Sequence, residues 1–261
     1  MPNLNIVILE KSKGTGGRMC TSRSSFGSTV DLGAQFITKS SNLTSTQEKL
    51  YNHLFDEGIL QPMPENVEGL RSLPYAWAHF IAIRDQESTL DGLMPHVARD
   101  QIEKLKAVKY CSRYALGFFY DSESSFFKDI SWCAKFINDD IIRYCAVDVH
   151  KRKGTGLPSV VFHTSKEFGA LYIDENADAV QDLIVKRIEH LFPQMPKPNE
   201  IKFQKWRYSQ AKKIYCEKQA CLVASNKPLL IFGGDGFSNS NFENCVLSAE
   251  NIAQKIIETV S

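Results

Sequence analysis

Residues 6–19, IVILEKSKGTGGRM, join a short apolar run to an acidic residue and then to a glycine-rich turn. The run at residues 6–9 is rich in β-branched side chains, which is typical of a buried strand. In dinucleotide-binding folds, an acid at the end of such a strand accepts hydrogen bonds from ribose hydroxyls, and Glu10 stands at that position. Glycines such as Gly17 let backbone amides approach a phosphate, and Arg18 offers a planar fork for its oxygens. The alternative is an ordinary hairpin turn with a surface arginine.

The order of these residues differs from the usual Gly-x-Gly-x-x-Gly fingerprint. Met19 stands where the third glycine belongs, and Glu10 precedes the glycines instead of following them by about 20 residues. This order predicts that Glu10 ends the second strand of a Rossmann unit. The first strand, its phosphate loop and its helix then have no counterpart in the sequence.

A second glycine-rich turn lies near the other end, in residues 228–237, PLLIFGGDGF. A buried strand precedes it, and a helix is expected from about residue 241 to residue 259. Glycines before a helix N-terminus are typical of anion sites, so Gly234, Gly236 and Phe237 mark a candidate cofactor contact. Asp235 is suited to bind a ribityl hydroxyl or to cap backbone amides; a simple strand-to-helix turn is the alternative.

The segments between these turns are of a different type. Residues 114–120, 141–149, 159–164 and 201–208 have strand-like patterns, and residues 177–192 form a strong amphipathic helix. Residues 46–58 and 100–108 are further helix candidates, whereas residues 61–100 show no sustained period. The similarity of the two ends indicates one domain built from both of them, with another inserted between.

Composition excludes several classes of function. Lys and Arg total 31 against 30 for Asp and Glu, so nothing indicates a nucleic-acid or membrane partner. The 7 cysteines include no Cys-x-x-Cys pair, which argues against a metal site and for free thiols. We see no apolar run long enough to span a bilayer and no signal peptide, and therefore expect a cytoplasmic protein.

Seven sequence blocks resemble the renalase branch of the flavin-containing amine oxidase superfamily, in the order in which that family has them. The blocks are EK at 10–11, GGRM at 16–19, DLGAQFIT at 31–38, SRYALG at 112–117, KWRYSQ at 205–210, GGDGF at 233–237 and SNF at 240–242. The resemblance covers residues 5–70 and about 100–261.

The resemblance implies an α/β (α+β) fold: an incomplete Rossmann-type FAD-binding domain interleaved with an antiparallel-sheet substrate domain. We place the first in residues 1–60 and 225–261 and the second in residues 61–224. It also implies oxidation of dihydro isomers of NAD(P) to NAD(P)+, with oxygen as acceptor and hydrogen peroxide as product. A secreted location is the family's alternative to the cytoplasm.

The resemblance also assigns roles to individual residues. Glu10 matches the ribose-binding acid, Arg18 an FAD-contacting arginine, and the GGDGF block a second FAD contact. Gln35 and Phe36 match the pair beside the flavin. His163 and Trp206 fall near the pocket over the isoalloxazine face and are the candidate catalytic residues. Without the resemblance, His163 is interpreted as a packed or capped residue on a strand, and Trp206 as a residue of the hydrophobic core.

Two departures from the family leave other functions open. The opening strand and phosphate loop lack a counterpart, and part of the family's middle, near residues 70–100 here, is missing or replaced. The alternatives are a catalytically silent nucleotide-binding or interaction protein and a monoamine oxidase. Hydride transfer to a flavin needs orientation and a dry pocket more than a general base, which suits a sequence without a triad, metal site or carboxylate pair.

Overall fold

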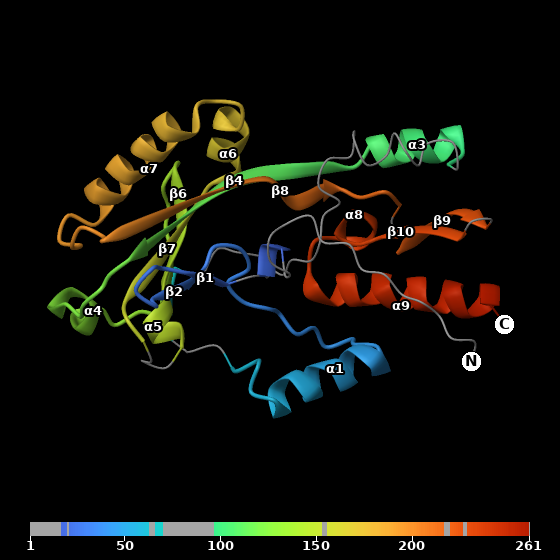
Figure 1. Cartoon of the computed structure of the whole chain (residues 1–261), viewed down its shortest axis with the longest axis horizontal. Helices are drawn as coiled ribbons and strands as arrows, with labels where there is room; N and C mark the ends of the chain where they lie inside the picture. Colours follow the sequence, from blue (N-terminus) through green and yellow to red (C-terminus); the bar gives the residue numbers. More distant parts are fainter. Residues whose placement is uncertain are drawn as a thin grey trace.

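The computed structural model describes residues 17–19, 21–62, 66–69, 97–152, 156–216, 220–226 and 229–260. The strand predicted at residues 5–9, and Glu10 with it, lies outside the described residues. Within them the chain is a mixed α/β protein, as predicted (Figure 1).

A six-stranded sheet forms the centre of the described structure. Its strand order is β3 (Val67–Glu68), β5 (Ala134–Phe136), β6 (Ile142–Val147), β7 (Ser159–Thr164), β4 (Lys109–Phe119) and β8 (Glu200–Lys213). The pair β3–β5 is parallel, and the other pairs are antiparallel. The predicted antiparallel sheet is therefore present, built mainly from the middle of the chain.

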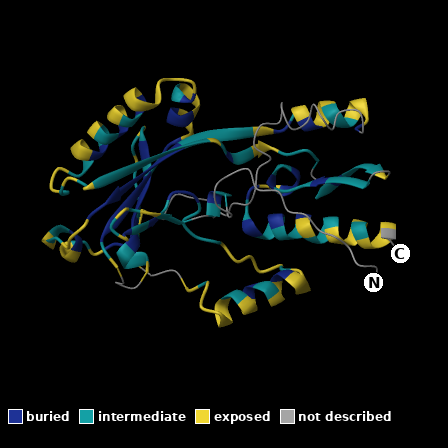
Figure 2. Cartoon of the chain, viewed as in Figure 1, coloured by how far each residue is buried: buried dark blue, intermediate teal, exposed yellow. Residues whose placement is uncertain are grey.

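Two helices cover one face of this sheet, α6 (Lys166–Tyr172) and α7 (Ala177–Leu191) (Figure 1). Helix α7 buries Val180, Ile184 and Ile188, which the 3.6-residue period places on one side. They pack with strand side chains such as Phe118 and Phe162 in the largest apolar cluster. Figure 2 shows the opposite, exposed side of α7 in yellow over the buried strands.

The other face of the sheet carries smaller elements: η1 (Gly17–Met19), the hairpin β1 (Thr21–Arg23) and β2 (Thr29–Asp31), and α5 (Asp148–Lys151). Val30 and Leu32 pack on Ala115, Tyr144 and Val161 of the sheet. A further short helix, α4 (Ser125–Asp129), follows β4. Gln35 and Phe36 follow Leu32 closely in the chain, and both line the pocket described below.

The C-terminal part forms a separate small layer. Strands β9 (Cys221–Asn226) and β10 (Leu229–Gly233) pair antiparallel, followed by α8 (Asp235–Ser238) and α9 (Phe242–Val260). Helix α3 (Arg99–Lys106) packs on this layer through Leu105 and Phe237. Helix α1 (Ser45–Asp56), capped by Thr44, packs on α9 through Tyr51 and Phe242.

Most predicted elements are present, and their differences have local causes. Strand β2 ends at Asp31, and Gly33 beyond it lies against the backbone of Arg18, where an added Cβ would stand 1.9 Å from the carbonyl oxygen. Strands β4 and β8 are longer than predicted, since their polar ends pair with each other. No helix among the described residues is both long and apolar enough to cross a membrane. The two-domain division stays a prediction.

Candidate functional site

A large pocket lies between the sheet, helix α6 and the turn before α9. Its volume is about 1790 Å³, well above the roughly 300–1,000 Å³ typical of a small-molecule site. Five sequence-predicted residues line it: Arg18, Gln35, Phe36, His163 and Trp206. The fold therefore brings these five residues, which come from segments far apart in the chain, to one pocket.

Aromatic side chains form one wall of the pocket. The Phe36 ring centroid lies 6.4 Å from that of Phe136 and 6.5 Å from that of Tyr144. Tyr144 in turn packs edge-on to His163, with ring centroids 5.8 Å apart. These two residues are cross-strand partners on β6 and β7, so the sheet register fixes their contact. Burial, with smaller effects from nearby Cys145, raises the pKa of Tyr144, so its hydroxyl stays protonated.

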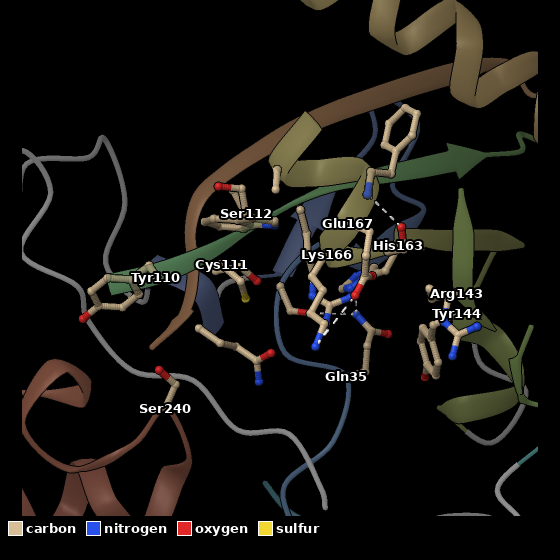
Figure 3. A pocket seen from close by; sticks show the side chains of 18 of the residues that line it. Gln35, Tyr110, Cys111, Ser112, Arg143, Tyr144, His163, Lys166, Glu167 and Ser240 are labelled. Atoms are coloured by element: carbon tan, nitrogen blue, oxygen red, sulfur yellow. Dashed lines mark hydrogen bonds and ion pairs between the residues drawn. The ribbon is translucent and has the colours of Figure 1, made fainter. Parts of the chain in front are cut away.

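The Gln35 side chain is held beside this wall by backbone carbonyls of two preceding residues. Its Nε2 donates to the carbonyl oxygens of Asp31 and Gly33, the latter at 3.1 Å, and lies 3.4 Å from His163 Nε2 (Figure 3). Two carbonyl acceptors fix the amide orientation, because only the NH₂ end can donate to them. The buried Oε1 then has no hydrogen-bond partner among the described residues. An acceptor of this kind suits a ligand N–H group.

Trp206 is fixed on the same side of the sheet. Its indole Nε1 donates to the Leu32 carbonyl oxygen at 2.9 Å, and its strand partner is Arg113. The hydrogen bond ties β8 to the segment that carries Gln35. Trp206 is half-buried and lines the pocket, so it presents a flat surface held at its polar end.

Arg18 and Asp235 belong to one buried polar network. Arg18 Nη2 donates to Asp235 Oδ2 at 2.8 Å, and the two side chains are 5% and 1% exposed. Arg18 Nη1 donates to the carbonyl oxygens of Tyr208 at 3.1 Å and Ser209 at 2.6 Å. Asp235 also accepts from Tyr110 at 3.0 Å and from Ser240 at 2.6 Å. The network joins η1, β4, β8 and the turn before α9, where Arg18 and Ser240 line the pocket.

The second glycine turn packs more tightly than the sequence indicates. Gly234 has φ +116°, which favours glycine, and its N–H donates to Ser248 Oγ at 2.8 Å. A Cβ at Gly236 would stand 2.9 Å from the Tyr110 hydroxyl. Phe237 is buried and stacks near Tyr215, with ring centroids 5.0 Å apart. None of these three residues lines the pocket, and nor does Asp235.

The remaining predicted residues are Gly17 and Glu10. Gly17 opens η1 with φ +50° and precedes Arg18 without lining the pocket. Glu10 lies outside the described residues. The cofactor roles given to Glu10, Gly17 and the GGDGF block stay predictions.

Several pocket residues were missed by the sequence reasoning. Tyr144 and Arg143 occupy a strand that was predicted, but neither was chosen as a site residue. Asn239, with φ +78°, and Asn241 line the pocket beside the block SNF. The available signal was the SNF block itself; for Arg143 and Tyr144 no local pattern marks the side facing the pocket.

Metal chemistry has no support within the described part of the chain. No group of three or more His, Cys, Asp or Glu side chains gathers there in an arrangement that would hold an ion. The six cysteines described are free thiols.

Comparisons with known proteins show similarity to flavin-containing oxidoreductases. A family model described as "Flavin containing amine oxidoreductase" matches residues 2–107. Renalase from Mus musculus is 26% identical over 309 residues, covering 95% of this chain and 90% of the relative. Because the alignment exceeds the 261 residues of this chain, the relative includes stretches with no counterpart here. A crystal structure of a putative protoporphyrinogen oxidase from Exiguobacterium has a TM-score of 0.49 and 12% identity, covering 64% of this chain and 38% of that one.

These findings place the chain among the oxidoreductase enzymes that use a flavin and act on small molecules. More narrowly, the similarity is to renalase and to the flavin-containing amine oxidoreductases.

Proposed function

We propose that the protein is an FAD-dependent oxidase of dihydro isomers of NAD(P). In the overall reaction, dihydro-NAD(P), oxygen and one proton give NAD(P)+ and hydrogen peroxide. The hydride of the reduced nicotinamide ring supplies both electrons, and oxygen accepts them. Bound FAD would supply the acceptor for the hydride and the redox chemistry that reduces oxygen.

The observation that carries this proposal is the combination of a flat aromatic wall with an unsatisfied buried acceptor. Phe36 and Tyr144 offer apolar surface for a planar ring, and Gln35 Oε1 needs an N–H donor. Both a flavin ring and a nicotinamide amide carry such a donor. The volume of about 1790 Å³ leaves space for more than one such group.

The pocket side chains serve to position the reacting groups more than to transfer protons. Phe36, Phe136 and Tyr144 exclude water from one side of the pocket. Trp206 is locked by its bond to the Leu32 carbonyl, and Gln35 by its bonds to two carbonyls, so both are preorganised. Close, aligned approach is the main requirement of hydride transfer, and such rigid surfaces supply it.

The cofactor residues are those predicted from the sequence. We assign Gln35 and Phe36 to the flavin ring, and His163 and Trp206 to the substrate side of the pocket. Arg18 is assigned to the phosphate end, with Gly17 beside it, and Glu10 to the ribose. The GGDGF block supports this end, with Asp235 holding Arg18 in place. In this proposal the FAD-binding domain comprises residues 1–60 and 225–261, and residues 61–224 form the substrate domain.

The lining of the pocket argues against a monoamine as substrate. Arg113, Arg143 and Lys166 all line it, and these positive charges repel an ammonium group. Of the acidic residues in the lining, Asp139 is engaged by Arg187 Nε at 2.9 Å, Glu167 lies 3.8 Å from the Lys166 ammonium, and Asp140 is exposed to solvent. An anionic substrate fits this charge arrangement better.

The test is product analysis with FAD-saturated protein in air. The 2- and 6-dihydro isomers of NAD(P), ordinary 4-dihydro NADH and a catecholamine are supplied separately. We expect the 2- and 6-dihydro isomers to give NAD(P)+ and peroxide in equal amounts, much faster than the other two. Equal rates with the catecholamine would support the amine-oxidase alternative, and no turnover with FAD bound would support the silent protein.

A further inference from the structure

A β-bulge turns two consecutive side chains of β6 toward the pocket. Ile142 pairs with Thr164, but the next pair along the strands is Tyr144 with His163. Arg143 is the extra residue, and both it and Tyr144 line the pocket (Figure 3). In a regular strand adjacent side chains would point to opposite faces of the sheet. Bulges are common next to active sites, where they redirect a side chain.

A second arginine brings another positive charge to the same wall. Arg113 lies on β4, and its Nη1 donates to the Thr164 carbonyl oxygen at 3.0 Å, next to the bulge. Burial lowers the pKa of Arg113; Cys111 and Glu167 act against this, and the charge of Arg143 acts with it. The two guanidinium groups therefore repel each other across the pocket wall, which is a cost to the folded protein that a bound anion would remove.

Three acidic residues also line the pocket: Asp139 and Glu167 have basic partners of their own, and Asp140 is exposed to solvent. Asp139 is held by Arg187 and by the backbone N–H groups of Ile141 and Ile142, at 3.0 and 2.8 Å. Glu167 is 72% exposed and lies 3.8 Å from the ammonium of Lys166, itself a pocket residue. Among the described residues, the Arg143 guanidinium has a single, long hydrogen bond, from Nη1 to the amide oxygen of Asn138 at 3.3 Å.

We propose that Arg143, presented by the bulge and assisted by the positive charge of Arg113, binds a phosphate group of the substrate and makes the enzyme select nucleotides over nucleosides. The inference rests on the proposed function and names the chemistry that recognises the non-reacting part of the substrate. A guanidinium suits this task because its planar fork matches phosphate oxygens. The aromatic wall lies beside it through Tyr144, so one ligand can reach both.

Two ligand pairs differ by a single phosphate and isolate this contact. The first pair, nicotinamide mononucleotide and nicotinamide riboside, is titrated into FAD-saturated protein by calorimetry. The second pair, their dihydro forms, is used as substrates for flavin reduction. We expect wild type to bind the mononucleotide at least about tenfold more tightly, the lower end for hydrogen bonds to charged groups. KM for the dihydro pair should show the same preference.

Three variants separate recognition from folding. Arg143→Gln should lose most of the nucleotide preference, and Arg143→Lys should restore only part of it, because an ammonium lacks the fork. Arg99→Gln, at an exposed arginine on α3 outside the pocket, is the matched control and should keep the preference. Thermal melts of all variants check that the fold is intact.

The outcomes distinguish this inference from the proposed function. Equal binding of the two ligands by wild type, or an unchanged preference in a folded Arg143→Gln protein, overturns the phosphate site even if the dihydro compounds reduce the flavin. A preference that collapses only in the Arg143 variants supports the site. It does so even if no dihydro compound reduces the flavin, a result that would count against the proposed function alone.

Discussion

Replacing Arg18 with alanine should strongly destabilise the fold, apart from any effect on FAD. The variant removes the Nη2 bond to Asp235 and the Nη1 bonds to the Tyr208 and Ser209 carbonyls. It also leaves the Asp235 carboxylate, 1% exposed, with the hydroxyl donors Tyr110 and Ser240 as its remaining side-chain partners among the described residues. Removing one partner of a buried ion pair costs about 3–5 kcal/mol.

For a chain of this size, that cost corresponds to a melting temperature lower by roughly 6–20 °C, at about 2–4 °C per kcal/mol. Urea unfolding and thermal melts, each with and without saturating FAD, measure it. A loss of stability of similar size in both conditions would mean that Arg18 stabilises the fold independently of FAD. A loss seen mainly with FAD identifies a cofactor ligand whose removal costs about 1.5–3 kcal/mol of binding. Arg18→Lys should recover part of either loss, since it keeps the charge without the fork.

An exposed pair in the same protein provides the control. Arg207 Nη2 lies 2.6 Å from Asp174 Oδ1, a shorter distance than in the Arg18–Asp235 pair, but the side chains are 45% and 79% exposed. Arg207→Ala should therefore cost less than about 1 kcal/mol. Equal, small losses for Arg18→Ala and Arg207→Ala would refute the reasoning, because burial would then not determine the strength of the pair.

Three further outcomes follow from the same structure. Burial raises the pKa of Asp31, but Lys151, Thr21 and Arg152 outweigh burial and lower the pKa below its usual 3.8. The stability that the ionised carboxylate contributes is therefore complete above that value and is lost as the pH falls. The free energy of unfolding should depend less on pH in the acid range for Asp31→Asn than for wild type. Tyr110→Phe should cost about 1.5–3 kcal/mol in urea unfolding, because Asp235 loses a donor. Gly33→Ala should cost about 3 kcal/mol or more, and unchanged circular-dichroism melts would contradict this, because its Cβ would stand 1.9 Å from a backbone oxygen.

Much of the fold follows from local sequence patterns. Strand β7 has the predicted bounds, and α7 differs from its prediction by one residue, because hydrophobic period and caps are local properties. The long ends of β4 and β8 were not predicted, since polar residues such as Lys109 and Lys213 form strand there only by pairing with each other. Strand β9 was missed for a similar reason: it depends on β10.

The candidate site is subject to the same limit, because its contacts join residues far apart in the sequence. Arg18 and Asp235 were each chosen from the sequence as cofactor residues, yet 217 positions separate them and nothing local indicates that they bind each other. The pocket position of Arg143 depends on a bulge, which is a property of the pairing of β6 with β7 and not of either strand alone. Residue types can be read from a sequence, but which residues meet requires the fold.

The most direct measurement of the central claim is anaerobic reduction of the bound flavin. FAD-saturated protein is mixed in a stopped-flow instrument with the 2- or 6-dihydro isomers of NAD(P), with 4-dihydro NADH, or with a catecholamine, and the visible flavin absorbance is followed before oxygen is admitted. The account predicts rapid bleaching by the 2- and 6-dihydro isomers, far slower bleaching by the other two, and peroxide on reoxidation. Bleaching by the catecholamine as fast as by the dihydro isomers, or by none of the compounds with FAD bound, would contradict it.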